Sequence, residues 1–334
     1  MNIPVATLKK YQKLSAHVRS NGILPIHKYL RFGEGHICKN VGHSFVTMAY
    51  DAEAVNDPVI LVSEDDLYPL LGSTVSSFIS INIVKGKVEL NDGRDRFLLQ
   101  QQDKKTFINP PTADGEPIPL SEEFIKAMAA AANFAIPVKD GPEYYNYVHI
   151  GEGAICAGEG FVVYHYPIEE PVKIVLLNYV AEAISVFKIE SFLESENYYF
   201  FYNSEVTFGY VKPTISWFDI RKLFQQKREH IFTVGSSDLL SFNNLTMKLT
   251  QNPIVTLSNG KMEMDDVLLD KHHEREVPGL KVPSPFTYNP TRMNVVLKSI
   301  DVEELDFAES APAYYISSKE TKATAIIAKI QKPQ

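Results

Sequence analysis

The sequence has few cysteines and no long hydrophobic run, and both absences exclude classes of protein. Two cysteines in 334 residues are too few for a disulfide scaffold. No apolar run approaches the roughly 20 residues of a membrane span, and no secretory signal is evident at the N-terminus. With 45% hydrophobic and 22% charged residues, the chain is neither disordered nor collagen-like. We therefore expect a soluble, cytoplasmic protein with one or more hydrophobic cores.

Acidic residues are absent from the first 33 residues and from residues 277–300, although the net charge of the chain is −8. The first acidic residue is Glu34, and the second stretch spans 277–300. These stretches hold the basic residues Lys9, Lys10, Lys13, Arg19, Lys28, Arg31, Lys281, Arg292 and Lys298. An acidic protein can still present one basic surface, so the net charge does not exclude a nucleic-acid partner.

A short motif recurs along the chain. The segment Gly-Glu-Gly-His-Ile-Cys at 33–38 returns as Gly-Glu-Gly-Ala-Ile-Cys at 151–156, and a weaker copy lies at 257–262. The two strong copies lie between β-rich runs, a pattern typical of a hairpin turn followed by a strand. Internal repeats of this kind predict an architecture built from similar modules.

Apolar residues at helical spacing form a second repeat. They occur at 67–74, 180–187 and 293–300, each set 113 residues after the one before. A longer helix is expected at the start of each module, at about 5–18, from Ser121 onward, and at about 237–251. The first helix should bury Leu8, Tyr11, Leu14 and Val18 and expose Lys9, Lys10, Lys13 and His17, and the third should bury Leu239, Phe242, Leu245 and Leu249.

The two repeats together divide the chain into three modules, which we place at 1–112, 113–214 and 215–334. The first joint falls in a segment rich in proline and glycine, 109–115, and the second falls within 212–230. Each module is expected to contain two helices packed on a largely antiparallel sheet. The predicted fold class is therefore α+β.

No motif for catalysis, cofactor binding or metal binding stands out. The Gly-Glu-Gly segments lack the Lys-Ser/Thr of a phosphate-binding loop. Cys38 and Cys156 occupy matching positions on strands of two modules, which predicts small core residues rather than a disulfide or metal pair. The tract Asp-Lys-His-His-Glu-Arg-Glu at 270–276 has neither cysteine partners nor a helical His-x-x-x-His spacing, so we expect a solvated loop. We expect no cofactor and no metal.

The three-fold pattern resembles the bacterial DNA polymerase III beta sliding clamp. Its local matches are Leu-Pro-Ile at 24–26, Asn-Phe-Ala at 133–135 with Lys-Asp at 139–140, Trp-Phe-Asp-Ile-Arg-Lys-Leu at 217–223 and Ala-Ile-Ile-Ala-Lys-Ile at 325–330. The resemblance implies the DNA clamp fold, in which a head-to-tail homodimer forms a six-module ring around duplex DNA. It also implies a non-catalytic processivity factor that holds DNA without sequence specificity, tethers the DNA polymerase and is opened by a clamp loader. Such a protein would work in the bacterial cytoplasm, or in the host cytoplasm if it is phage-encoded.

The resemblance implies two sets of site residues. The residues expected to face DNA are Lys9, Lys10, Lys13, Arg19, Lys126, Lys139, Lys248, Arg292 and Lys298. A hydrophobic pocket between the second and third modules would receive partner peptides and be lined by Tyr145, Cys156, Gly158, Phe161, Phe218, Lys222, Leu223, Pro312, Ile326, Ile327, Ala328, Lys329 and Ile330. Scattered basic side chains suit a ring that must attract phosphates without reading bases. The family's Gly-His-Arg-Leu stretch reads Gly-Glu-Gly-Phe at 158–161, so peptide specificity is expected to differ.

Two other functions remain open at the level of sequence. A repeat-built structural or interaction protein, such as a phage component, would need no ring around DNA. An enzyme could instead have its cleft at a module junction, because carboxylates far apart in the sequence can meet in space.

Overall fold

The computed structural model of the chain describes residues 1–19, 24–51, 56–139, 141–215, 220–251, 253–266, 271–310 and 313–330. Within these residues one order of elements occurs three times: a strand, a helix, four strands, a second helix and three strands. A short helix, α5 (Arg221–Phe224), lies between the second and third runs. Single 3-10 turns occur at Pro25–Lys28, Lys104–Thr106 and Glu143–Asn146.

The bounds of the elements follow this order. The first run contains β1 (Asn2–Pro4), α1 (Val5–Ser15), β2 (Tyr29–Gly33), β3 (His36–Asn40), β4 (Ser44–Ala49), β5 (Ile60–Ser63), α2 (Glu64–Ser73), β6 (Phe78–Val84), β7 (Lys87–Asn91) and β8 (Arg96–Gln100). The second contains β9 (Ile118–Pro119), α3 (Glu122–Ala132), β10 (Tyr147–Gly151), β11 (Ala154–Glu159), β12 (Val162–Pro167), β13 (Ile174–Leu177), α4 (Asn178–Val186), β14 (Ser191–Glu194), β15 (Tyr198–Tyr202) and β16 (Val206–Val211). The third contains β17 (Glu229–Gly235), α6 (Ser236–Leu249), β18 (Val255–Ser258), β19 (Lys261–Asp266), β20 (Lys271–Glu276), β21 (Phe286–Tyr288), α7 (Pro290–Ser299), β22 (Glu304–Ser310), β23 (Ala313–Ser318) and β24 (Thr321–Ala328).

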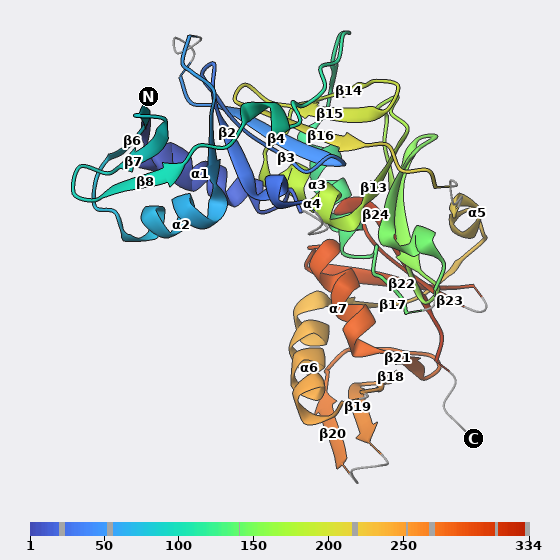
Figure 1. Ribbon diagram of the computed structural model, residues 1–334. Coiled ribbons are helices and arrows are strands. Elements are labelled where there is room, and N and C mark those ends of the chain that lie inside the picture. Colours follow the sequence, from blue (N-terminus) through green and yellow to red (C-terminus); the bar gives the residue numbers. More distant parts are fainter. Residues whose placement is uncertain are drawn as a thin grey trace. The chain divides into compact units, whose positions relative to one another are not determined.

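The strands form antiparallel sheets within two compact units (Figure 1). Unit one, Met1–Glu122 with Ala183–Pro213, holds the sheets β1-β6-β7-β8 and β5-β2-β3-β4-β16-β15-β14-β9. Unit two, Glu123–Glu182 with Thr214–Gln334, holds β13-β10-β11-β12-β24-β23-β22-β17 and β20-β19-β18-β21. The expected α+β class with antiparallel sheets is confirmed. The division into modules at 112 and 214 stays a prediction.

The repeated Gly-Glu-Gly motif forms the same tight hairpin turn twice. Glu34 and Gly35 have φ angles of 55° and 76°, and Glu152 and Gly153 have 51° and 82°. Two successive residues in the left-handed region suit the twist of the flanking strands, and glycine adopts this backbone without a Cβ clash. The hairpin predicted for each copy is therefore confirmed.

Helix α1 buries the residues that its apolar spacing predicts. Leu8, Tyr11 and Leu14 are buried in unit one, and so is Val18, although the helix ends at Ser15 and not at the expected residue 18. The Tyr11 hydroxyl donates a hydrogen bond of 3.1 Å to the backbone carbonyl of Val46 in β4, which satisfies its polar atom inside the core. Burying each aliphatic or aromatic side chain stabilises the folded state by about 1.5–3 kcal/mol, so this face holds the helix on the sheet.

Helix α6 departs from the prediction in its second half. Leu239 and Phe242 are buried as expected, but Leu245 is 37% exposed and Leu249 is only half-buried. Asn243 and Thr246 are fully buried instead. Asn243 can take an inward position because its side chain makes hydrogen bonds to two other residues of unit two, which apolar spacing cannot reveal.

The tract at 270–276 is a second departure, because Lys271–Glu276 forms strand β20 and not a solvated loop. Its residues pair with β19, with Glu263 opposite Glu274. A strand of charged residues is stable here because only one of its faces meets the core, where the His273 ring stacks on Phe242 with centroids 5.0 Å apart. Asp270 itself lies outside the described residues.

Both cysteines are free and buried, as predicted for core residues. Burial raises the pKa of the Cys38 thiol to about 11, so it stays protonated at neutral pH. No helix in the described part of the chain is long and apolar enough to cross a membrane.

Candidate nucleic-acid and partner-binding surfaces

Helix α1 presents a basic face in unit one. Lys9, Lys10 and Lys13 are exposed on the side opposite the buried residues, and Arg19 is exposed just beyond the helix. Lys10 pairs with Glu205, an exposed residue just before β16. The first turn of α1 holds no acidic residue and the last turn holds Lys13, which suits the negative end of the helix dipole. The face is thus solvent-directed and mostly positive.

Basic residues of unit two lie on or near three helices. Lys126 on α3, Lys248 in the last turn of α6 and Lys298 in the last turn of α7 are exposed, as is Lys139 after α3. Helices α6 and α7 lie side by side (Figure 1), joined by a hydrogen bond of 3.0 Å from Asn243 to Asn294. Each unit therefore offers exposed lysines on helical surfaces.

Arg292 differs from the other predicted DNA-facing residues. Its Nε lies 2.7 Å from Oε1 of Glu159, a buried carboxylate at the end of β11. Its guanidinium carbon lies 3.9 Å from the centroid of the Phe161 ring. Arg292 is therefore half-buried, paired and placed beside two residues of the predicted peptide surface. Sequence spacing missed this contact because α7 and β11 are far apart along the chain.

The residues predicted to line the peptide pocket fall into a buried layer and an exposed layer. Cys156 and Ile326 belong to a core cluster with Ile220, Phe224 and Tyr315, and Ile327 is buried as well. The His165 ring stacks on Phe224 with centroids 4.7 Å apart, and the Tyr315 hydroxyl donates a hydrogen bond of 2.7 Å to the Leu223 carbonyl. These contacts hold α5 on the sheet of unit two and leave Lys222 and Leu223 exposed.

The exposed layer surrounds the tight turn between β11 and β12. Phe161 is 53% exposed, and its carbonyl accepts a hydrogen bond of 2.8 Å from the backbone of Ala328 at the end of β24. A side chain on Gly158 would clash, because its Cβ would lie 2.5 Å from the Val162 carbonyl oxygen. Tyr145, Ala328, Lys329 and Ile330 are half-buried, and Lys329 pairs with Glu309. Phe218 and Pro312 lie outside the described residues.

Ile220, Phe224, Glu159 and Arg292 are therefore the residues of this surface that sequence reasoning missed. For Phe224 a signal existed, since it follows the matched segment 217–223 by one residue. For the Glu159–Arg292 pair no local signal existed, because no repeating sequence pattern marks an ion pair between distant segments.

A cleft of about 580 Å³ in unit two bears on the enzyme hypothesis. It is lined by charged residues of both signs, among them Glu123, Lys126, Asp301, Lys319 and Lys322. Hydrogen bonds from Tyr166 and Lys322 lower the pKa of the Glu123 carboxyl. A carboxylate held in its ionised form is a poor proton donor at neutral pH, so this cleft does not favour acid catalysis.

Comparison with known proteins adds one finding, and it concerns the fold. No protein-family model matches the sequence, and no curated protein matches it. Solved structures do match over nearly the whole chain. A putative DNA polymerase III beta subunit from Eubacterium rectale has a TM-score of 0.83 at 14% identity and 99% coverage of both chains, and the beta subunit from Streptococcus pyogenes has 0.84 at 14% identity and the same coverage. The Helicobacter pylori beta clamp, solved bound to a DNA ligase peptide, has 0.81 at 13% identity, covering 99% of this chain and 100% of that one. The chain therefore has the fold of the DNA polymerase III beta subunit, the beta sliding clamp, as the resemblance implied.

Proposed function

We propose that this chain is a DNA sliding clamp: two copies join head to tail into a ring that encircles duplex DNA and tethers a DNA polymerase. The proposal divides each copy into three modules, at 1–112, 113–214 and 215–334. It assigns no catalytic step to the protein and places it in the cytoplasm of a bacterium or of a phage host. The observation that carries it is a pair of strand edges, on β8 and β20. Among the described pairings these two lack the neighbour that the corresponding strands of the other runs have.

The three runs of elements make corresponding strands comparable. By their order, β4, β12 and β20 correspond to one another, and so do β16, β24 and β8. Strand β4 pairs with β16, and β12 pairs with β24. Among the described pairings, β20 has only β19 beside it and β8 has only β7. The same pairing, made between β20 of one copy and β8 of the other, would extend both four-stranded sheets to eight strands.

The register of this pairing follows from the repeat. Cys156 pairs with His165 across β11 and β12, and Glu263 pairs with Glu274 across β19 and β20. Cys156 and Glu263 each stand three residues after the repeated turn glycine, so Glu274 is the counterpart of His165. His165 pairs with Thr324 of β24. Glu274 should therefore face the β8 counterpart of Thr324.

That counterpart is Arg96. Ile79 and Leu305 correspond because each pairs with the residue two positions before the first helix of its run. The same correspondence can be followed through the pairings β6–β7 and β7–β8 in the first run and β22–β23 and β23–β24 in the third. It makes Arg96 the equivalent of Thr324. An arginine of one copy thus lies opposite Glu274 of the other, and opposite charges on paired strands stabilise the pairing.

Exposed apolar residues on β8 support the same proposal. Phe97 and Leu98 are 45% and 49% exposed on an open strand edge. Such edges promote pairing with another chain, and proteins usually protect them. Because β20 meets β8 and not another β20, the contact is heterologous, and a heterologous contact forms a closed ring only if its rotation closes. Two copies of three modules give the six modules of the clamp ring.

The exposed lysines and the surface around Phe161 supply the other two activities of the proposal. The exposed lysines and Arg19 named above would contact phosphates, which gives affinity without base recognition. The surface formed by Phe161, Leu223 and the end of β24 would bind peptides of the polymerase and of the clamp loader, with apolar side chains as anchors.

Solution mass and DNA retention test the proposal together. We expect a species of twice the chain mass of 37.6 kDa, retained on nicked circular DNA after loading and lost when that DNA is linearised. Equal loss from circular and linear DNA would refute the ring. A monomer at micromolar concentration, or a large assembly, would favour a structural protein.

A further inference from the structure

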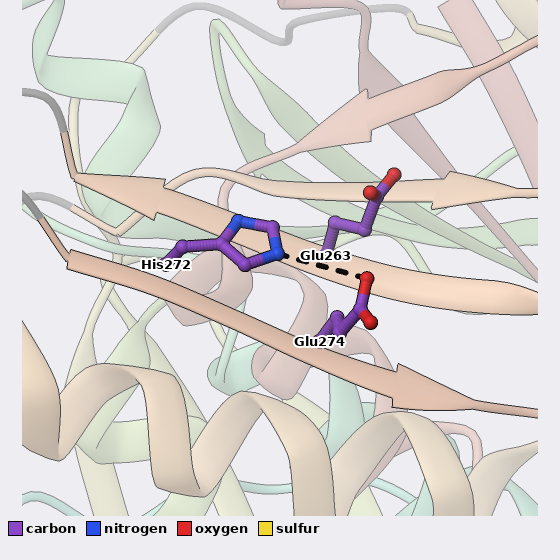
Figure 2. Close-up of side chains that lie close together, drawn as sticks. All are labelled: Glu263, His272 and Glu274. Atoms are coloured by element: carbon purple, nitrogen blue, oxygen red, sulfur yellow. Dashed lines mark ion pairs between the residues drawn. The ribbon is translucent and has the colours of Figure 1, made fainter.

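A cluster of metal-ligating side chains lies on one face of the hairpin β19–β20 (Figure 2). Glu263 pairs across the strands with Glu274, and Asp265 pairs with His272, so all four side chains share a face. One ligand atom from each of Glu263, His272 and Glu274 lies within 4.8 Å of the other two. Ligands about 2.1 Å from one metal ion are separated by roughly 3–4 Å, so small side-chain rotations would bring these three around one ion.

The histidine of this cluster is already oriented for a ligand. Its Nδ1 lies 2.7 Å from Oδ1 of Asp265, and its Nε2 faces Oε2 of Glu274 at 3.6 Å. A carboxylate that accepts the Nδ1 proton orients the ring so that Nε2 points toward Glu274, and a metal ion would bind Nε2 in its deprotonated form. This arrangement recurs in metal sites, where the second carboxylate raises the basicity of the ligating ring.

The ammonium group of Lys261 already lies close to both carboxylates of the cluster. The Lys261 Nζ lies 2.6 Å from Oε1 of Glu263 and 3.7 Å from Oε2 of Glu274. Lysine has a long, flexible side chain, and here 41% of it is exposed, so the ammonium can swing into solvent. Lys261 would therefore compete with a metal ion for the same two carboxylates.

We propose that Glu263, His272 and Glu274 bind a zinc-type divalent ion, with Asp265 as the positioning residue of His272. One imidazole and two carboxylates suit Zn²⁺, whereas Mg²⁺ and Ca²⁺ prefer shells made of oxygen alone. Three protein ligands leave a fourth position for water. In the single chain the site is open to solvent, since the side chains of His272 and Glu274 are about half exposed, so the ion needs no conformational opening to enter.

Calorimetric titration of the untagged, metal-stripped protein with ZnCl₂ and separately with MgCl₂ tests this site. We expect one equivalent of zinc and no heat from magnesium. His272→Ala should weaken zinc binding at least tenfold, and Asp265→Asn should weaken it about tenfold through loss of positioning. Lys261→Met should tighten zinc binding because the competing ammonium is gone.

His230→Ala is the matched control, because His230 is also exposed and lies 3.5 Å from a single carboxylate, Asp306. It should leave zinc binding unchanged. The proposal fails if the wild type and Lys261→Met both bind no zinc, if His272→Ala binds as well as the wild type, or if the control loses affinity equally. Circular dichroism confirms that each variant is folded. Glu274 also faces Arg96 of the other copy in the proposed ring, so zinc would compete with that pairing. Failure to bind zinc would leave the ring proposal, which solution mass tests, unaffected.

Discussion

Arg292 donates a hydrogen bond from Nε to Oε1 of Glu159 over 2.7 Å, joining helix α7 to the end of strand β11. The Glu159 side chain is only 7% exposed, and the arginine also covers the face of the Phe161 ring. A buried carboxylate needs a partner, because its desolvation is otherwise uncompensated. The pair therefore holds Phe161 and α7 in a fixed relation within unit two, and it makes Arg292 part of the proposed peptide surface.

Replacing Arg292 by alanine should therefore affect stability more than DNA retention. The change leaves Glu159 buried without its guanidinium. We expect a loss of about 3 kcal/mol in the free energy of unfolding, measured with urea, at the low end for a broken buried pair because Arg292 is only half-buried. Retention on nicked circular DNA should fall no more than for a neutral control. The double variant Glu159→Leu with Arg292→Met should recover most of the stability, because no charge is then buried. A strong loss of DNA retention in a folded Arg292→Ala protein would place this residue on the DNA face instead.

The basic face of α1 gives a second prediction. Changing Lys9, Lys10 and Lys13 together to glutamate should weaken DNA retention and lower the slope of log K against log salt by about 2–3, as expected for three lost phosphate contacts. Stability should change little, because all three side chains are exposed. The matched control changes Lys85, Lys87 and Lys105, which are equally exposed in unit one but were not assigned to DNA. Equal effects of the two triple variants would refute the assigned face.

The proposed contact between two copies can be tested by charge reversal in metal-free buffer. Glu274→Arg should shift the protein toward monomer in sedimentation experiments, because it places two arginines opposite each other. Adding Arg96→Glu should restore part of the dimer. Restoration stays partial because Arg96 also pairs with Glu89 of its own chain. If the double variant dissociates as fully as Glu274→Arg alone, the register is wrong.

The buried asparagines of unit two predict a loss of stability. Asn243 donates to Asn294 and accepts a hydrogen bond of 2.9 Å from the Tyr288 hydroxyl, all inside the core. Asn243→Leu would leave the other two polar groups buried and unsatisfied, which costs about 1–3 kcal/mol for each group. A fall in the urea midpoint is expected. Asn244→Leu, on the exposed side of α6, is the comparison: it removes only the hydrogen bond of 3.0 Å that Asn244 accepts from Asn294 and should have a smaller effect.

Much of this fold could be predicted because its signals are local. The apolar spacing in α1 and the repeated Gly-Glu-Gly turn depend only on neighbours in the sequence, and both were confirmed. The errors have long-range causes. Leu245 was expected to be buried on α6. Asn243 is buried instead, because its hydrogen-bond partners come from β21 and α7. Strand β20 was missed because pairing with β19, and not apolar content, makes it a strand.

The candidate site was harder to predict for the same reason. Resemblance supplied the lysines and the peptide-surface positions, and those assignments remain predictions. It could not supply the Glu159–Arg292 pair, in which residues of two distant segments meet. Nor could it supply the cluster on β19 and β20, since cross-strand register decides which charged residues share a face.

His149 gives a prediction about pH. Its ring is 2% exposed in β10, and burial lowers its pKa, while a hydrogen bond of 3.3 Å to the Tyr144 carbonyl opposes part of this shift. Below about pH 6.5 the unfolded chain binds a proton that the folded site resists. The free energy of unfolding should therefore fall as the pH drops below this value, by at most about 1.4 kcal/mol per pH unit from this residue. Above it, both states hold the neutral ring and the contribution is constant.

Urea unfolding of His149→Gln between pH 7.5 and 5 checks the sign. Glutamine keeps a hydrogen-bond donor near the Tyr144 carbonyl but does not titrate, so the variant should lose less stability than the wild type over this range. His36→Gln, at an exposed position in β3, is the control and should follow the wild-type profile. A His149→Gln profile as steep as the wild type would show that other groups cause the acid sensitivity. A flatter profile would identify the buried imidazole as one of its sources, because no other titrating group is changed in that variant.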